Sequence, residues 1–234
     1  MTVRSVVSLA ALCISLGAET PGLLPDTIVE NYCTASRIQE QALRAATMEV
    51  EIAGSLPRLK KQGKLRALRR ISGLGRITYE KLRFEGDNTV KKEVIARYLT
   101  AEAEAQRDSS LAVTPQNYKF KYKGQRQLDG RDVHIFQVSP KQKRQGLFKG
   151  ELWIDAATYL RVQESGYLVK SPSLAIRKVA FIRKYEIRNG ISVPRQVQSV
   201  TDTWLVGRAE LTIDYTNFSI DGRKEGVASD TDGQ

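Results

Sequence analysis

The sequence predicts an α+β fold in which one strongly curved antiparallel sheet forms an open half-barrel, with helices covering its concave face. Two observations support this prediction. Residues 145–218 read as four or five consecutive strands with turn chemistry at the joins and no helical pattern between them. Before them, residues 27–46 and 89–99 carry apolar side chains at helical spacing. Counting the extended segments gives about ten strands.

The C-terminal strands are joined by turns of recognisable composition. Residues 155–158 (DAAT) follow a strand dense in aromatic and aliphatic side chains. Asn189 and Gly190 have the composition of a two-residue type I′ turn, which needs a positive φ at both positions. Gly207 separates two further strands. Each strand is therefore expected to pair antiparallel with the next.

Two amphipathic helices are expected among the N-terminal strands. Thr27 and Glu30 are spaced as a capping box, and the apolar period after them continues to about Ala46. Asp87 or Thr89 can cap the second helix. Both helices have one apolar face, so both can pack against the sheet.

Four short stretches of the C-terminal half carry a recognisable pattern: residues 150–155 (GELWID), 161–166 (RVQESG), 190–194 (GISVP) and 211–218 (LTIDYTNF). Together they resemble the LolA-like proteins, the periplasmic outer-membrane lipoprotein-sorting proteins and their relatives. The matched residues are strand ends, turns and a proline after a hairpin, so they indicate the fold more strongly than an activity. The resemblance implies a carrier that shields acyl chains in an apolar cleft.

The first 18 residues are typical of a signal peptide. Arg4 lies in a short basic region, residues 5–14 form a compact apolar run, and Ala18 ends a small-residue stretch suited to cleavage. We therefore expect a periplasmic protein whose mature chain begins at Glu19. The alternative is a buried N-terminal helix.

The mature chain is expected to form a single LolA-like domain over residues 19–220, followed by a flexible acidic tail over residues 221–234. Leu12 stands where lipid attachment at Cys13 would need a small residue, so a lipoprotein site is not expected. Cleavage leaves Cys33 alone and without an internal disulfide.

The chain is strongly basic, with 37 Lys and Arg residues against 26 Asp and Glu residues and a formal charge of +11. Such a field attracts nucleic acid, acidic lipid head groups or lipopolysaccharide. An export signal argues against nucleic acid. We therefore expect a monomer whose partners are lipid or lipoprotein acyl chains and an anionic membrane surface.

Ten cationic side chains fall within residues 58–83, with a single acidic residue among them. In an extended chain Lys64, Arg66 and Arg70 project to one side of the strand, and Lys61 and Arg69 project to the other. Both sides cannot be buried, so we hypothesise that Lys64, Arg66 and Arg70 dock the protein on an anionic membrane. The alternative is a solvated strand face.

Strand alternation gives candidates for the lining of an apolar cleft between helices and sheet. One face of each strand is apolar, and that face is either core or cavity wall, which alternation alone does not decide. The candidates are Ile77, Tyr79, Phe120, Tyr122, Leu152, Ile154, Leu211 and Ile213.

The sequence offers little for catalysis. His134 is the single histidine and lies between apolar residues of a strand, so a metal site built from histidines is nearly excluded. No GxSxG, HExxH or phosphate-loop motif is present. We expect no catalytic residue, no metal and no cofactor.

These observations together predict a periplasmic lipid or lipoprotein carrier that protects acyl chains during transfer towards the outer membrane. The alternative is an envelope sensor, or a regulatory or scaffold protein on the same fold, that binds lipid or a protein partner without transporting it.

Overall fold

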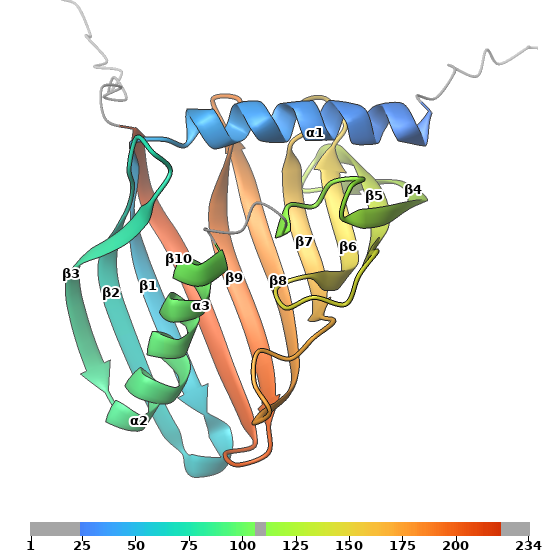
Figure 1. Ribbon diagram of the computed structural model, residues 1–234. Helices are drawn as coiled ribbons and strands as arrows, with labels where there is room; N and C mark the ends of the chain where they lie inside the picture. The colour runs from blue at the N-terminus through green and yellow to red at the C-terminus, as the bar shows by residue number, and fades with distance from the viewer. Residues whose placement is uncertain (1–23, 106–110, 221–234) are drawn as a thin grey trace, which may run out of the picture.

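The computed structural model describes residues 24–105 and 111–220. Within them, ten strands form one curved antiparallel sheet in the order β3-β2-β1-β10-β9-β8-β7-β6-β5-β4 (Figure 1). Strands β3 and β4 lie at opposite edges, so the sheet stays open, as the sequence predicted. The strands are β1 (Ala46–Leu56), β2 (Lys61–Ile71), β3 (Ile77–Gly86), β4 (Tyr118–Leu128), β5 (Arg131–Pro140), β6 (Phe148–Asp155), β7 (Arg161–Leu168), β8 (Ile176–Arg188), β9 (Ile191–Thr203) and β10 (Arg208–Ile220).

Among the described residues, two helical segments of more than one turn accompany the sheet (Figure 1). Helix α1 (Pro25–Ala42) runs across one end of the strands. The second segment is continuous through α2 (Asn88–Val90), the wider π-helical turn η2 (Lys91–Ala96) and α3 (Arg97–Ala105). It lies over the concave face of β1 and β2. The predicted combination of curved sheet and helices is therefore confirmed.

Helix α1 differs from the sequence expectation at both ends. The helix begins at Pro25, where a missing backbone N–H costs no hydrogen bond because the first turn has no partner for it. Leu24 is the N-cap residue, and no side chain caps the helix. Thr27 therefore lies inside the helix, and the predicted capping box is wrong. The helix ends at Ala42, and Ala46 opens β1 instead of continuing the helical period.

The second helical segment starts as predicted and packs on two glycines of the sheet. Asp87 Oδ1 accepts a hydrogen bond from the Thr89 backbone N–H over 2.7 Å. Beneath the segment, Gly54 and Gly63 face each other on β1 and β2. A Cβ atom on Gly54 would lie 2.9 Å from Val90 Cγ1, so a side chain at this position would force Val90 or the helix to shift.

The core on the concave side is divided into two clusters of buried side chains. The β1 cluster lies between β1, β2, β10 and the second helical segment, and the α1 cluster lies between α1 and β4, β5 and β6. The β1 cluster includes Ile52, Leu65, Val94, Ile95 and Ile213, and the α1 cluster includes Ile28, Tyr118, Phe136, Phe148 and Leu152.

Turns form where the sequence chemistry indicated them. Asn189 and Gly190 adopt φ values of 49° and 74° between β8 and β9, as a type I′ turn requires. Asp155 Oδ1 accepts hydrogen bonds from Thr158 through its backbone N–H at 2.8 Å and its hydroxyl at 2.7 Å. These local signals set the order of the hairpins.

The predicted signal peptide (1–18) and acidic tail (221–234) lie outside the described residues. Among the residues that are described, no helix has both the length and the apolar character needed to cross a bilayer.

Candidate functional site

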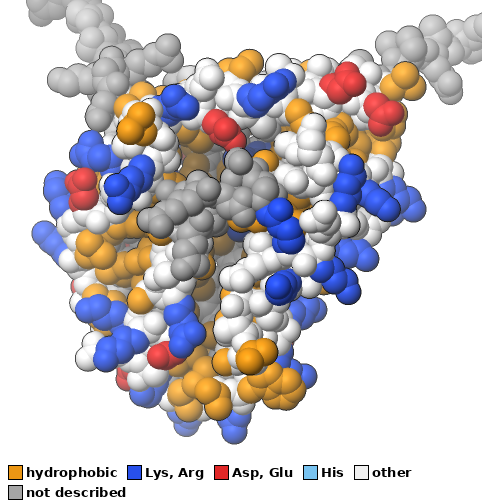
Figure 2. Space-filling view, viewed as in Figure 1, with side chains coloured by type: hydrophobic (Ala, Val, Ile, Leu, Met, Phe, Trp, Pro, Cys, Tyr) orange, Lys and Arg blue, Asp and Glu red, His pale blue; other side chains and the backbone are white. Residues whose placement is uncertain are grey.

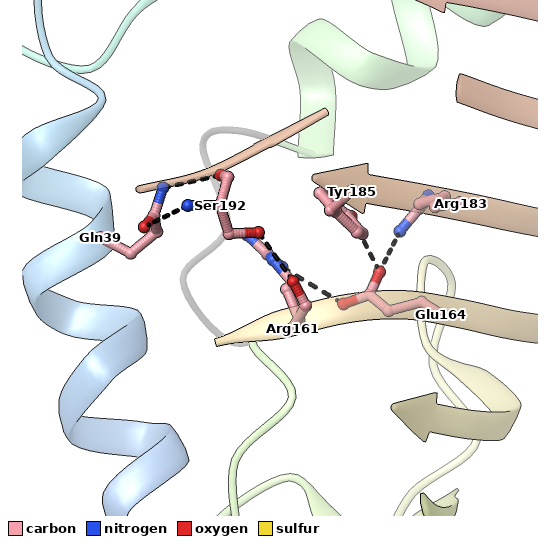
Figure 3. A network of polar contacts seen from close by, with 6 residues as sticks. All are labelled: Gln39, Arg161, Glu164, Arg183, Tyr185 and Ser192. Carbon is pink, nitrogen blue, oxygen red and sulfur yellow. Dashed lines mark hydrogen bonds and ion pairs between the residues drawn. The ribbon is translucent and has the colours of Figure 1, made fainter. Parts of the chain in front are cut away.

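A buried carboxylate, Glu164, lies on the concave face between the two apolar clusters. Figure 3 shows the polar side chains around it. Glu164 on β7 accepts hydrogen bonds from Arg161 Nη1 at 3.2 Å, Arg183 Nη1 at 3.3 Å and the Tyr185 hydroxyl at 3.2 Å. The register of β7 and β8 places Glu164 directly opposite Arg183, so strand pairing itself brings the two charges together. We refer to Arg161, Glu164, Arg183 and Tyr185 as the polar floor.

Glu164 and Arg183 occupy the middle of a row of side chains that face one another across six strands. Opposite positions of an antiparallel ladder lie on the same face of a sheet, so this row crosses the concave side from one cluster to the other. Its outer members belong to the two cores. From β5 to β10 the row consists of Phe136, Leu152, Glu164, Arg183, Val197 and Ile213.

The polar floor carries two positive charges and one negative charge at neutral pH. Burial alone would raise the pKa of Glu164, but Arg161 and Arg183 hold the pKa of this carboxyl below its ordinary value. Burial, with Glu164 adding to the effect, raises the pKa of Tyr185 to about 12, so its hydroxyl remains a donor. The floor is therefore cationic overall.

Both arginines of the polar floor reach solvent while the carboxylate beneath them does not. The side chains of Arg161 and Arg183 are 32% and 44% exposed. Their guanidinium carbons lie 4.9 Å above the Tyr185 ring and 4.5 Å above the Phe181 ring. In the space-filling view, a hollow separates the second helical segment from the half of the molecule that holds the α1 cluster (Figure 2).

Helix α1 is fastened to the sheet beside the polar floor (Figure 3). The Gln39 side-chain amide donates to the Ser192 carbonyl over 2.7 Å and accepts from the Ser192 backbone N–H over 3.0 Å. The Ser192 hydroxyl in turn donates to the Arg161 carbonyl over 2.8 Å. One chain of hydrogen bonds therefore links the helix, β9 and the polar floor.

A second polar group lies under α3. Arg69 on β2 pairs with Glu102 on α3 over 3.2 Å, and the Tyr79 hydroxyl also donates to Glu102. Burial would lower the pKa of Arg69, but Glu102, Tyr79 and Tyr215 raise it, so the guanidinium stays charged. These contacts join α3 to the edge half of the sheet.

The eight residues predicted to line a cleft fall into two groups. Ile77, Tyr79, Leu211 and Ile213 belong to the β1 cluster or pack against it, and Phe120, Tyr122, Leu152 and Ile154 do the same in the α1 cluster. Leu152 and Ile154 are fully buried. Strand alternation left open whether these side chains form core or line a cavity, and Leu152 and Ile154 are part of the core. Contact of any of the eight residues with a ligand stays a prediction.

The basic row predicted to dock on a membrane lies on the convex side of β2, because Leu65 and its alternate neighbours fill the concave core. Lys64 and Arg66 both pair with Glu51, over 2.7 Å and 2.9 Å, and Arg70 Nε lies 3.2 Å from a carboxylate oxygen of Glu80. Each cation has an acidic partner on a neighbouring strand, and membrane docking by this row stays a prediction.

No protein-family model and no curated protein matches this chain. In fold, the chain resembles solved LolA-like proteins. One similar structure is a DUF1329 family protein from Desulfovibrio piger, with 15% sequence identity over 84% of this chain and 95% of that chain and a TM-score of 0.45.

Two further structures carry the names that the sequence resemblance led us to expect. An outer membrane lipoprotein-sorting protein domain from Vibrio parahaemolyticus has 11% identity over 86% of this chain and 95% of that chain, with a TM-score of 0.41. A LolA superfamily protein from Nitrosomonas europaea has 11% identity over 87% of this chain and 96% of that chain, with a TM-score of 0.38.

The polar floor was not predicted from the sequence. Arg161 and Glu164 lie in a stretch that was interpreted as a fold motif, and Arg183 comes from the next strand beyond an irregular connection. The feature that could have revealed it is Glu164, an acidic residue that lies opposite the core residue Leu152. Recognising this feature requires knowing how β6 and β7 pair, which the sequence alone does not give.

Proposed function

We propose that this protein is a periplasmic carrier of a lipid or lipoprotein whose acyl chains are shielded on the concave side of the sheet. The observation that supports this most is the pair of part-exposed arginines, Arg161 and Arg183, that lies on the concave side between the two apolar clusters. A cationic centre flanked by apolar side chains matches an amphiphile with an anionic head group.

The two parts of such a ligand would be held by different forces. Each methylene group removed from water contributes about 0.8 kcal/mol, so acyl chains against the edges of the two clusters supply most of the affinity. A phosphate or carboxylate would accept hydrogen bonds from Arg161 and Arg183, which are the strong charge-assisted type. A carrier of this kind needs no catalytic group.

Binding of a fluorescent phosphatidylglycerol to the purified mature protein tests the proposal. We expect saturable binding that Arg183→Ala weakens about tenfold, the loss typical of one charge-assisted contact. Lys184→Ala is the matched control, since Lys184 is the exposed neighbour on the same strand. Absence of saturable binding, or an equal loss in both variants, would contradict the proposed site.

Transfer distinguishes a carrier from a sensor. A carrier loaded with labelled lipid releases it to acceptor vesicles, whereas a sensor or scaffold retains it and forms a stable complex with a protein partner. A chase with unlabelled vesicles, followed by gel filtration and lipid analysis, measures which of the two occurs.

Export is part of the same proposal. N-terminal sequencing of the protein recovered from a periplasmic extract should begin at Glu19, because cleavage after Ala18 fits the small-residue pattern. An intact Met1 in the cytosolic fraction would contradict this, as would an acylated Cys13.

A further inference from the structure

Exposed apolar side chains gather at the end of the sheet opposite α1 (Figures 1 and 2). Trp204 and Leu205 form the turn between β9 and β10 and are 66% and 82% exposed. Leu174, just before β8, is 99% exposed, and Leu59 is exposed in the single helical turn η1 (Pro57–Leu59) between β1 and β2. We refer to these four residues as the apolar tip.

The three loops that carry the apolar tip are neighbours in space. The Trp204 backbone N–H donates to the Ala175 carbonyl over 3.1 Å, which joins the turn before β10 to the loop before β8. On the other side, η1 contacts β10, and the Arg58 side chain lies over Gly207. The apolar side chains therefore form one protruding surface and not three separate exposures.

Cationic side chains surround this surface. The Arg177 guanidinium carbon lies 4.5 Å above the Trp204 ring, a cation–π contact that holds the charge beside the indole. A pocket of about 440 Å³ opens next to it and is lined by Arg177, Lys178, Asp202, Thr203, Gly207 and Arg208. Three cations share this pocket with one carboxylate, which Arg208 approaches to 3.6 Å.

The composition of the tip fits the boundary between water and lipid. A tryptophan at the junction of apolar and polar groups is typical of the membrane interface, and cations beside it lie at the depth of the lipid phosphates. The apolar groups sit on projecting loops, a shape that enters a soft head-group layer more readily than it fits a protein groove. The excess of positive charge is complementary to anionic lipid.

We propose that the apolar tip inserts into the interface of an anionic phospholipid bilayer, with Arg177, Lys178 and Arg208 contacting lipid phosphates. The proposal differs from docking through the convex row of Lys64, Arg66 and Arg70. It also holds whether or not the concave side carries lipid, because every residue involved lies on the loops or on the adjoining ends of β8 and β10 at the end of the sheet opposite α1.

Tryptophan fluorescence gives a direct test, since the chain has two tryptophans and the other is Trp153, half-buried on β6. In a Trp153→Phe background, Trp204 is the single tryptophan, and it can be excited selectively over the tyrosines. Vesicles of equimolar phosphatidylcholine and phosphatidylglycerol should shift its emission to the blue, and brominated lipids should quench it. Added salt should reverse both effects, because the cations act through screened attraction.

Variants made in the wild-type chain, with Trp153 retained, identify the binding surface by vesicle co-sedimentation. Trp204→Ser with Leu205→Ser, and separately Arg177→Glu with Arg208→Glu, should each lower vesicle partitioning at least about tenfold. Leu82→Ser is the matched control, because Leu82 is an exposed apolar residue on the edge strand β3, far from the tip in the fold.

Three results would overturn the proposal. The first is a Trp204 emission that anionic vesicles leave unchanged. The second is equal binding to pure phosphatidylcholine vesicles, which would remove the role of the cations. The third is loss of binding on reversal of Lys64, Arg66 and Arg70 to Glu while the Trp204 and Leu205 variant still binds. The fluorescence test uses the unaltered tip, so it shows whether Trp204 enters the bilayer even if a tip variant folds poorly.

Discussion

Glu164 places a buried charge in a row of side chains that is otherwise apolar except for its partner Arg183. A buried ion pair rarely stabilises a protein more than well-packed apolar side chains of the same volume would. Leu152 on one side of Glu164 and Val197 beyond Arg183 are apolar members of the same row, so the polar pair interrupts a run of core positions. The carboxylate therefore makes sense as the group that holds Arg161 and Arg183 in place on the concave surface.

Replacing Glu164 by Gln should lower the free energy of unfolding by about 2 kcal/mol near neutral pH, less than for a fully buried pair because Arg183 reaches solvent. The pKa of Glu164 is lowered in the folded protein. Its charge therefore contributes stability above the unfolded pKa of about 4.3, and this contribution is lost as the pH falls through the folded pKa.

The difference between wild type and Glu164→Gln should accordingly shrink below about pH 4, as measured by urea unfolding at a series of pH values. Glu40→Gln, on the exposed side of α1, is the control and should leave the stability of the protein almost unchanged. A difference for Glu164→Gln that stays constant down to about pH 3 would contradict the ionic role of this carboxylate.

Gln39 fixes α1 through two hydrogen bonds to one backbone unit. Gln39→Ala leaves the N–H and the carbonyl of Ser192 without partners in a buried place, so it should cost about 1–3 kcal/mol. Gln41→Ala removes an exposed amide from the same helix and should be almost neutral. Thermal denaturation of both variants measures the contrast, and equal melting temperatures would contradict a stabilising role for the two hydrogen bonds of Gln39.

At the scale of elements, β6 and β7 approach each other closely at a pair of glycines. Gly150 and Gly166 face each other in the ladder, and a Cβ atom on Gly150 would lie 1.8 Å from the Ser165 carbonyl oxygen. Gly166 has a φ of 153°, which a residue with a side chain rarely adopts. The strands can keep this spacing only with glycine at both positions.

Gly150→Ala should therefore push β6 and β7 apart and lower the melting temperature by about 5 °C or more. The matched control is Gly73→Ala, because a Cβ atom there meets no other atom within 4 Å. Circular dichroism melting curves of the two variants compare them directly. A melting temperature for Gly150→Ala equal to that of Gly73→Ala would show that the strands adjust without cost.

Local chemistry accounts for the elements that could be predicted from the sequence. The Asn189-Gly190 turn and the Asp87 cap depend only on neighbouring residues, and both form as expected. The start of α1 was misplaced because Pro25 and the capping pattern at Thr27 are competing local signals for the same turn.

Long-range register explains what could not be predicted. The pairing of Glu164 with Arg183 depends on how two strands align across an irregular loop, and no local pattern fixes that alignment. Alternation placed Leu152 and Ile154 on the apolar face correctly. Whether that face is core or cleft is decided by the position of α1, which belongs to the three-dimensional arrangement.

At the scale of the whole molecule, the proposed carrier function links ligand binding to stability. A ligand that binds only the folded state at about 100 times its dissociation constant adds about 2.7 kcal/mol to the free energy of unfolding. For a chain of this size that raises the melting temperature by about 5 to 10 °C. A short-chain phosphatidylglycerol, kept below the concentration at which it forms micelles, should produce this rise in the wild type.

The same measurement on variants tests where the lipid binds. Arg183→Ala should reduce the rise to a few degrees, because the phosphate loses a charge-assisted partner, while Lys184→Ala should behave as the wild type. The corresponding short-chain phosphatidylcholine should stabilise less than phosphatidylglycerol, since its head group carries no net charge to match the cationic floor. A rise that is equal for both lipids and for both variants would place the ligand away from the polar floor.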